Sequence, residues 1–208
     1  MDLNAAPRLA APGAGLPKPE LYLGRLMFAF KRWTGTRSAF DAEFQAERQR
    51  IRNLVDQCDS DSACIPVLIA RCRGMEDSSR YWSVWMTLDH LRIVNQSFIG
   101  IIKALSQGTV PKSKASTANV KPSPGVTAAV LAQYEEVCDK LVATVGAVPN
   151  LKTPARYAHP WFGAMNAAGW HALAGGHMRI HRTQIERILD GLRANAARRS
   201  SARTPTGV

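Results

Sequence analysis

The sequence predicts an all-α protein, and specifically a four-helix bundle. Four stretches carry large apolar side chains at the three- and four-residue spacing of one helix face, with residues that start or stop helices beside them. No set of segments alternates apolar and polar residues as the strands of a sheet would. A length of 208 residues suits one domain with a single core. The predicted helices cover residues 39–57, 79–107, 125–147 and 167–190.

The residues before the first bundle helix fall into two parts. Residues 1–19 are rich in Ala, Pro and Gly, and we expect them to form a flexible tail. Residues 20–37 are apolar and basic; we favour a helix packed on the outside of the bundle, and the alternative is a patch that lies on a membrane surface. Ser38 and Asp41 then resemble a capping box at the start of the helix over 39–57.

The connection to the second helix is expected to be irregular. Pro66 and Gly74 interrupt residues 58–78, and a proline inside a helix removes a backbone hydrogen bond. Ser78 or Ser79 can then accept the hydrogen bond that caps the second helix.

The later connections constrain the topology. Residues 108–124 form a polar, Pro-rich link that is too long for a tight hairpin, so we expect a crossover between parallel neighbours. Asn166 can cap the fourth helix, and Gly191 lies where a helix-ending glycine is expected. The domain therefore covers residues 20–191, and the basic residues 192–208 are expected to form a disordered tail.

The net charge of +11 is confined to three short regions without acidic residues, which leaves the predicted bundle close to neutral. We therefore expect no nucleic-acid partner. The basic residues of the three regions are Arg25, Lys31, Arg32, Arg37, Lys112, Lys114, Lys121, Arg193, Arg198, Arg199 and Arg203.

No apolar run reaches the roughly 18 residues that span a bilayer, and the N-terminus lacks the apolar core of a signal peptide. We therefore expect a soluble, cytoplasmic protein with no membrane partner.

Three histidines are predicted to point into the bundle. His177 and His181 are four residues apart on the apolar stripe of the fourth helix, so both imidazoles can turn toward one point. His90 lies on the apolar stripe of the second helix, near its middle. Buried imidazoles need polar partners, and this favours a metal site over the alternative of separate core histidines, each with its own hydrogen bond.

Other polar residues are candidates to surround these histidines. Ser97 and Gln184 are polar residues on apolar stripes and can contact the site or a substrate; the alternative is an ordinary core hydrogen bond. Asp89 points about 100° around the helix from His90, and Glu76 precedes His90 by about 20 Å along the helix axis. Neither is therefore expected to bind a metal. His171 is expected to be peripheral.

The motifs around the histidines resemble those of one known family. The pattern WxVxMTLDHL ending at Leu91, the HPWFG of residues 159–163 and GWHxLAGxHMRIHRxQIERI over residues 169–188 are similar to the DinB-like superfamily of metal-binding four-helix bundles. The resemblance covers about residues 39–190. It implies an up-down-down-up bundle in which His90, His177 and His181 hold one divalent metal. It also permits His159 to line the entrance to the site, and a loop-packing role is the alternative.

The metal site would be of the open, catalytic type. Three neutral imidazoles leave coordination positions free, and zinc, nickel, iron and manganese all accept such ligands. The pair reads HMRIH rather than HExxH, so Met178 stands where a zinc peptidase has its general base, which argues against peptidase activity.

The resemblance implies a metal-dependent enzyme, because members of this superfamily include thiol S-transferases and hydrolases. We therefore expect a thiol S-transferase or hydrolase that acts on a small molecule, with a low-molecular-weight thiol as candidate cosubstrate. The alternatives are a non-catalytic metal-binding stress-response scaffold and a polyanion binder that uses the basic arms. Gly175 and Gly176, off the apolar stripe of the fourth helix, indicate close helix packing or a homodimer contact.

Overall fold

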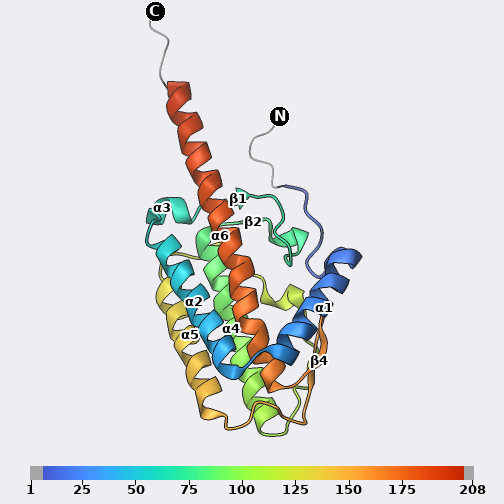
Figure 1. Ribbon diagram of the computed structural model, residues 1–208. Helices are drawn as coiled ribbons and strands as arrows, with labels where there is room; N and C mark the ends of the chain where they lie inside the picture. Colours follow the sequence, from blue (N-terminus) through green and yellow to red (C-terminus); the bar gives the residue numbers. More distant parts are fainter. Residues whose placement is uncertain (1–6, 204–208) are drawn as a thin grey trace, which may run out of the picture.

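The computed structural model describes residues 7–203, and four long helices form its bundle (Figure 1). α6 packs against α2 and α4, and α4 packs against α5. α2 and α6 run in one direction, and α4 and α5 run in the other (Figure 1). The prediction of an all-α, up-down-down-up four-helix bundle is therefore confirmed. The bundle helices are α2 (Arg37–Val55), α4 (Val84–Ser106), α5 (Val130–Ala147) and α6 (Ala167–Arg203).

Shorter elements lie in the connections. α1 lies outside the bundle against α6, and two antiparallel pairs, β1 with β2 and β3 with β4, are the strands of the described residues. Neither pair was predicted, but no larger sheet occurs within residues 7–203. The bounds are α1 (Lys18–Thr34), α3 (Ser60–Ala63), β1 (Val67–Leu68), η1 (Asp77–Ser79), β2 (Tyr81–Trp82), η2 (Thr117–Val120), β3 (Tyr157–His159) and β4 (Gly163–Met165).

Side-chain caps fix where the bundle helices begin. Thr36 accepts a hydrogen bond from the Ala39 N–H at 3.2 Å, and Asn166 accepts one from the Gly169 N–H at 3.0 Å. The expected start of the second helix at Ser78 or Ser79 is wrong, because Ser83 makes the cap there and accepts the Met86 N–H at 3.1 Å. The third helix likewise begins at Val130 and not at residue 125.

The expected end of the last helix at Gly191 is also wrong. α6 continues to Arg203, so residues 192–203 are helical and not a disordered tail, while residues 204–208 lie outside the described part. A Cβ at Gly191 would lie 2.5 Å from a Val67 methyl group. This glycine therefore lets β1 approach α6 closely instead of ending the helix. None of the helices within residues 7–203 has the length and apolar content needed to cross a membrane.

The core extends along the whole bundle and includes side chains from α2, α4, α5 and α6. Each fully buried large apolar side chain contributes about 1.5–3 kcal/mol. Fully buried large side chains include Ile51, Leu88, Leu91, Ile102, Tyr134, Leu141, Met178, Ile185 and Ile188.

A Cβ at Gly175 would lie 2.9 Å from the Cγ of Glu43 on α2, which supports the helix-packing interpretation of that glycine.

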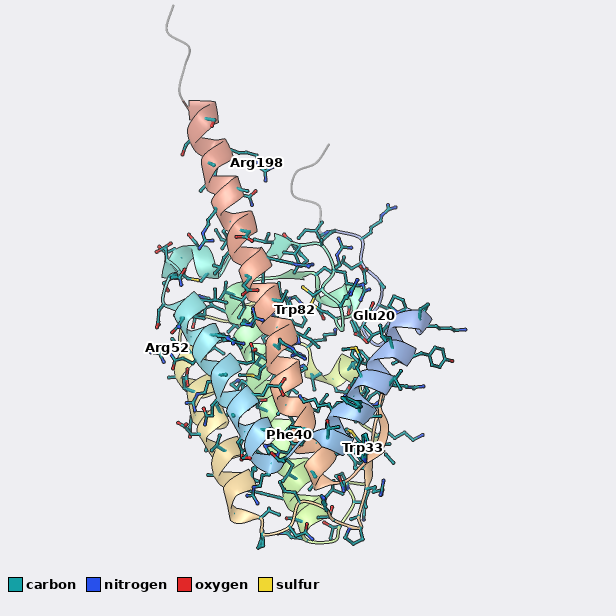
Figure 2. The ribbon with its side chains drawn as sticks, in the orientation of Figure 1. Glu20, Trp33, Phe40, Arg52, Trp82 and Arg198 are labelled. Carbon is teal, nitrogen blue, oxygen red and sulfur yellow. The ribbon has the colours of Figure 1, made fainter. Side chains whose placement is uncertain are left out.

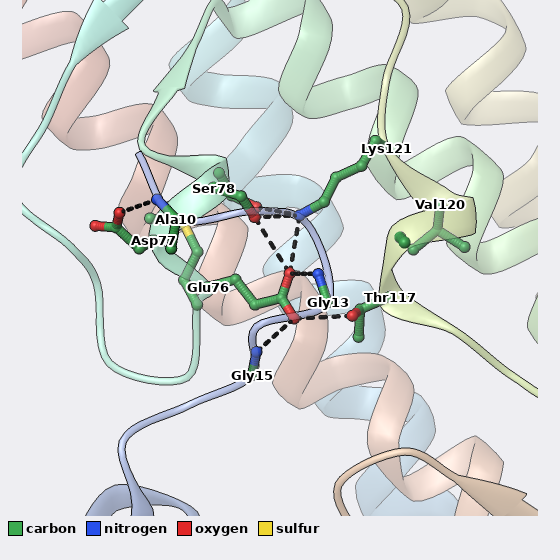
Figure 3. A network of polar contacts seen from close by, with 12 residues as sticks. Ala10, Gly13, Gly15, Glu76, Asp77, Ser78, Thr117, Val120 and Lys121 are labelled. Carbon is green, nitrogen blue, oxygen red and sulfur yellow. Dashed lines mark hydrogen bonds and ion pairs between the residues drawn. The ribbon is translucent and has the colours of Figure 1, made fainter. Parts of the chain in front are cut away.

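Glu76 fastens two connections to each other (Figure 3). Its carboxylate is 3% exposed and accepts hydrogen bonds from Thr117 Oγ1 at 2.8 Å and from Lys121 Nζ at 3.1 Å, both in the crossover between α4 and α5. It also accepts the backbone N–H groups of Gly13 and Gly15, at 3.2 and 3.3 Å. The expectation of a flexible tail is therefore wrong for these residues, and residues 1–6 lie outside the described part.

We predict that Glu76→Gln lowers the free energy of unfolding at pH 7 by about 1–3 kcal/mol, because Lys121 and the other donors lose a buried carboxylate. Burial raises the pKa of Glu76, but the hydrogen bonds from Thr117, Gly13 and Lys121 outweigh it and hold this pKa below its ordinary value of 4.5. The stabilisation is therefore complete above about pH 4.5 and is lost as the pH falls through the lower, folded-state pKa. Urea unfolding at several pH values should show the wild type and the variant converging in this acid range.

Glu136→Gln is the matched control. Glu136 is exposed and pairs with Lys140 one turn away, so its loss should change stability by less than about 0.5 kcal/mol. Equal stability of wild type and Glu76→Gln at pH 7 would contradict the assigned role of Glu76.

Candidate metal centre

His90, His177 and His181 converge in the interior of the bundle. Each offers one ring nitrogen, and these three atoms all lie within 4.8 Å of one another. Nε2 of His90 and Nε2 of His177 are 3.2 Å apart. Metal–nitrogen distances of about 2.0–2.1 Å in a tetrahedral site place ligand nitrogens about 3.3 Å apart.

The crossover orients His90. Nδ1 of His90 lies 2.6 Å from the carbonyl oxygen of Val120 in η2. Because a carbonyl oxygen only accepts hydrogen bonds, Nδ1 carries the hydrogen and the lone pair is on Nε2. That lone pair faces the other two histidines.

Gln184 orients His181 in the same way. Nε2 of Gln184 donates to the carbonyl oxygen of Ser79 at 2.7 Å, and this fixes which end of the amide faces the histidine. The amide oxygen then accepts from Nδ1 of His181, at 2.7 Å. The His181 hydrogen is therefore on Nδ1, and its Nε2 has a lone pair. Hydrogen bonds of this kind from the second ring nitrogen are typical of metal-bound histidines.

His177 lacks such support. Its Nδ1 is buried and has no hydrogen-bond partner among the described residues. Since nothing in that part of the chain selects its tautomer, the position of the ring comes from packing in α6, where Phe98 approaches it with ring centroids 6.1 Å apart.

Burial keeps all three imidazoles neutral. It lowers the pKa of His90 to about 4, partly opposed by the Val120 hydrogen bond. Burial also holds the pKa values of His177 and His181 well below 6.5, and the neighbouring histidines lower them further. At neutral pH each ring therefore keeps a lone pair with which it can bind a cation.

Aromatic side chains and one cation surround the cluster. Trp82 on β2 stacks on His181, with centroids 6.0 Å and planes 10° apart, and its ring centroid is 5.1 Å from that of His90 (Figure 2 labels Trp82). Lys121 Nζ lies 5.5 Å from the centre of the Trp82 ring. The charge of Lys121 also lowers the pKa of His90 and of His181. The environment therefore combines aromatic walls with one cation, Lys121, which is itself paired with Glu76.

His159 lies beside the cluster but is not one of its three converging residues. It stands on β3, where its Nδ1 accepts the Trp161 N–H at 3.1 Å and its ring stacks on Phe162 with centroids 5.0 Å apart. Burial lowers its pKa to about 4, and it is close enough to affect the pKa of His177. Both the packing role and a place near the site are thus compatible with its position.

Ser97 does not reach the cluster. Its side chain is exposed and donates to the Ile93 carbonyl at 3.0 Å. Helical phase places it on the side of α4 that carries His90, but the face that packs into the core is centred on residues such as Asn95 and Phe98. His90 lies at the edge of that face and is covered by the crossover, whereas Ser97 is not covered.

The other acidic and imidazole candidates have separate partners. Asp89 accepts hydrogen bonds from Arg92 at 2.7 Å and from the Ser123 N–H at 3.1 Å, which ties down the end of the crossover. His171 is buried, with Nε2 2.9 Å from a carboxylate oxygen of Asp41. Within residues 7–203, the histidine cluster includes no carboxylate.

Sequence reasoning missed the two backbone carbonyls that orient the histidines. Val120 and Ser79 act through main-chain oxygens that every residue has, so their identities carry no signal. Trp82 falls within the helix predicted over residues 79–107 but reaches the site from β2.

The cluster fits a divalent metal ion. The donor set is three neutral imidazoles, two of which are held with Nε2 toward the centre, and this set suits zinc, nickel, iron or manganese. The described residues thus contain a site that could hold a metal.

Comparison with known proteins agrees with this architecture. The model of the DinB superfamily matches residues 43–185, which include all three histidines. The chain belongs to the DinB superfamily. A solved structure, described as the crystal structure of TT2238, a four-helix bundle protein, has 20% sequence identity and a TM-score of 0.53; the match covers 73% of this chain and 98% of that one. At this identity TT2238 shows the shared fold alone. The comparison with curated proteins gave no match.

We predict that Gln184→Leu weakens metal binding about 10–100-fold, because His181 loses the acceptor that fixes its tautomer. Competition with a chromophoric chelator measures the affinity. Circular dichroism must accompany it, since the Ser79 carbonyl also loses its donor at a cost of about 1–3 kcal/mol.

Ser97→Ala is the control and should bind metal like the wild type. Unchanged affinity in a folded Gln184→Leu protein would contradict the orienting role of Gln184.

Proposed function

We propose that His90, His177 and His181 hold a catalytic divalent metal ion in this member of the DinB superfamily. The observation that carries the proposal is the pair of hydrogen bonds that His90 and His181 donate to the Val120 carbonyl and to the Gln184 amide oxygen, which leave the Nε2 lone pairs of both histidines facing the centre of the cluster. Without a cation at the centre, Nε2 of His177 can donate to the lone pair of His90 at 3.2 Å, but this single N–H cannot satisfy the lone pair of His181 as well.

We further propose that the substrate is a small molecule with a thiol, ester or other group that reacts as an anion. A divalent metal in such a site would act as a Lewis acid and lower the pKa of a bound thiol or water toward neutral pH. The three histidines contribute no negative charge, so a bound divalent cation would keep its full charge; Lys121, although paired with Glu76, adds a smaller positive contribution. An anionic group therefore gains more from this site than a neutral one does.

The surrounding residues support chemistry protected from bulk water. Trp82 and Phe98 pack against the imidazoles and exclude solvent from two sides. Within the described residues the cluster includes no carboxylate that could serve as a general base, which favours a thiol S-transferase or a hydrolase of small molecules over a peptidase. A low-molecular-weight thiol is the cosubstrate we would test first.

The test is a titration of the metal-free protein with cobalt(II), followed by addition of a thiol. We expect about one equivalent of tightly bound cobalt in the wild type, and none in His90→Ala, His177→Ala or His181→Ala. Addition of the thiol should change the visible spectrum of the wild-type protein alone. Turnover of thiol-acceptor and ester substrates is then measured with metal present.

His171→Gln is the matched histidine control and should retain its cobalt, since His171 pairs with Asp41 away from the cluster. Chelated wild type should keep its helical circular dichroism because the core is apolar and extensive. Metal binding without any spectral response to anions and without turnover would support the non-catalytic scaffold instead. Full cobalt content in the three alanine variants would contradict the metal site itself.

A further inference from the structure

Six large apolar side chains of α1 project into solvent from one face of the helix. Their exposed fractions run from 56% to 82%, and no residue of α1 is buried. Their spacing repeats every three to four residues, so they form one continuous stripe. Contiguous exposed apolar surface of this kind marks an interaction site. The stripe consists of Tyr22, Leu23, Leu26, Met27, Phe30 and Trp33.

The opposite side of α1 already has partners. Phe28 packs on Phe162 with ring centroids 4.7 Å apart, and Arg25 Nε donates to the Trp161 carbonyl at 2.6 Å. Glu20 pairs with Arg71, and Lys31 pairs with Glu43. The interpretation of residues 20–37 as a helix packed on the bundle therefore holds for this side alone and does not account for the stripe. Figure 2 shows α1 crossing the outside of the bundle, with Glu20 near its first turn and Trp33 near its last.

Uncompensated cations lie beside the stripe. Arg32, Lys152 and Arg156 line a groove of about 980 Å³ together with Trp33, and none of these three cations has an acidic partner within residues 7–203. Burial, and then the charge of Arg156, lowers the pKa of Arg32, so the two guanidinium groups repel each other. The acidic side chain of α1, Glu20, is held by Arg71 and by the Gly74 N–H. The outer face of α1 is therefore apolar, and a cationic groove adjoins it at its Trp33 end.

We propose that α1 is a docking helix for an anionic lipid surface. A helix with aromatic and aliphatic residues on one face and Arg or Lys at its margins lies in the plane of the membrane interface, with its apolar face about 5–10 Å deep. Trp33 and Tyr22 are residue types that favour this boundary, and each basic residue near an anionic surface strengthens binding.

Charge favours lipid over a second copy of this chain. A second copy would bring a surface of the same net sign, and the described part of this face offers no acidic side chain to pair with Arg32, Lys152 or Arg156. The net charge of +11 adds to that repulsion. Anionic headgroups supply the missing negative charge, and acyl chains cover the apolar side chains.

The test is co-sedimentation of the full-length protein with vesicles of phosphatidylcholine alone or of phosphatidylcholine with phosphatidylglycerol. We expect binding to the anionic vesicles that falls with added salt, and much weaker binding to the neutral ones. Leu26→Ser with Phe30→Ser should weaken binding at least about tenfold, because two large apolar contacts are lost. Arg32→Gln with Arg156→Gln should weaken binding to the anionic vesicles and reduce its salt dependence.

Ile65→Ser with Leu68→Ser is the matched control, since both residues are exposed and apolar but lie away from α1, at 40% and 49% exposure. This variant should bind like the wild type. Apart from Arg32, which is half-buried, these positions are exposed, so thermal unfolding should be nearly unchanged in the serine variants; circular dichroism verifies that every variant is folded.

Three results would overturn the proposal. The first is wild-type protein that stays in the supernatant with anionic vesicles. The second is binding that survives the loss of Leu26 and Phe30, which would assign it to charge alone. The third is a concentration-dependent dimer, without vesicle binding, that Leu26→Ser with Phe30→Ser dissociates; this would assign the stripe to a second copy.

Discussion

The hydrogen bond from His90 to the Val120 carbonyl links the centre of the bundle to the long crossover. It requires η2 to lie against α4 at one height, and Glu76 holds η2 there by binding Thr117 and Lys121. The same carboxylate binds the backbone of residues 13–15, so the segment before α1 and the crossover share one buried anchor. The geometry of one histidine thus depends on residues from three parts of the chain.

The helical phase of the sequence predicted the convergence of the three histidines because it depends only on positions within helices. Positions 177 and 181 share a face of α6 over one turn, and a tightly packed bundle brings that face toward α4. Helical phase gave the wrong result for Ser97, because phase describes the faces of one helix and does not show which neighbouring segment covers each face. Asn95, on the core-facing side of α4, is fully buried beside Cys138 and Met178 and was not singled out from the sequence.

The connections carried the least sequence information. Residues 58–78 were expected to be irregular, with a helix starting at Ser78 or Ser79, but Tyr81 and Trp82 pair with Val67 and Leu68 and delay the helix to Val84. Gly191 shows the same limit, since a glycine that lets Val67 approach α6 is indistinguishable in sequence from one that ends a helix. In each case the deciding contact is between residues far apart in the chain.

X-ray absorption spectroscopy of the zinc-loaded protein tests the central claim most directly. We expect scattering from three imidazole rings, with nitrogen at about 2.0–2.1 Å and the remaining positions filled by light atoms. Fewer than three imidazoles, or a sulfur scatterer at about 2.3 Å from a cysteine, would contradict a site built from His90, His177 and His181.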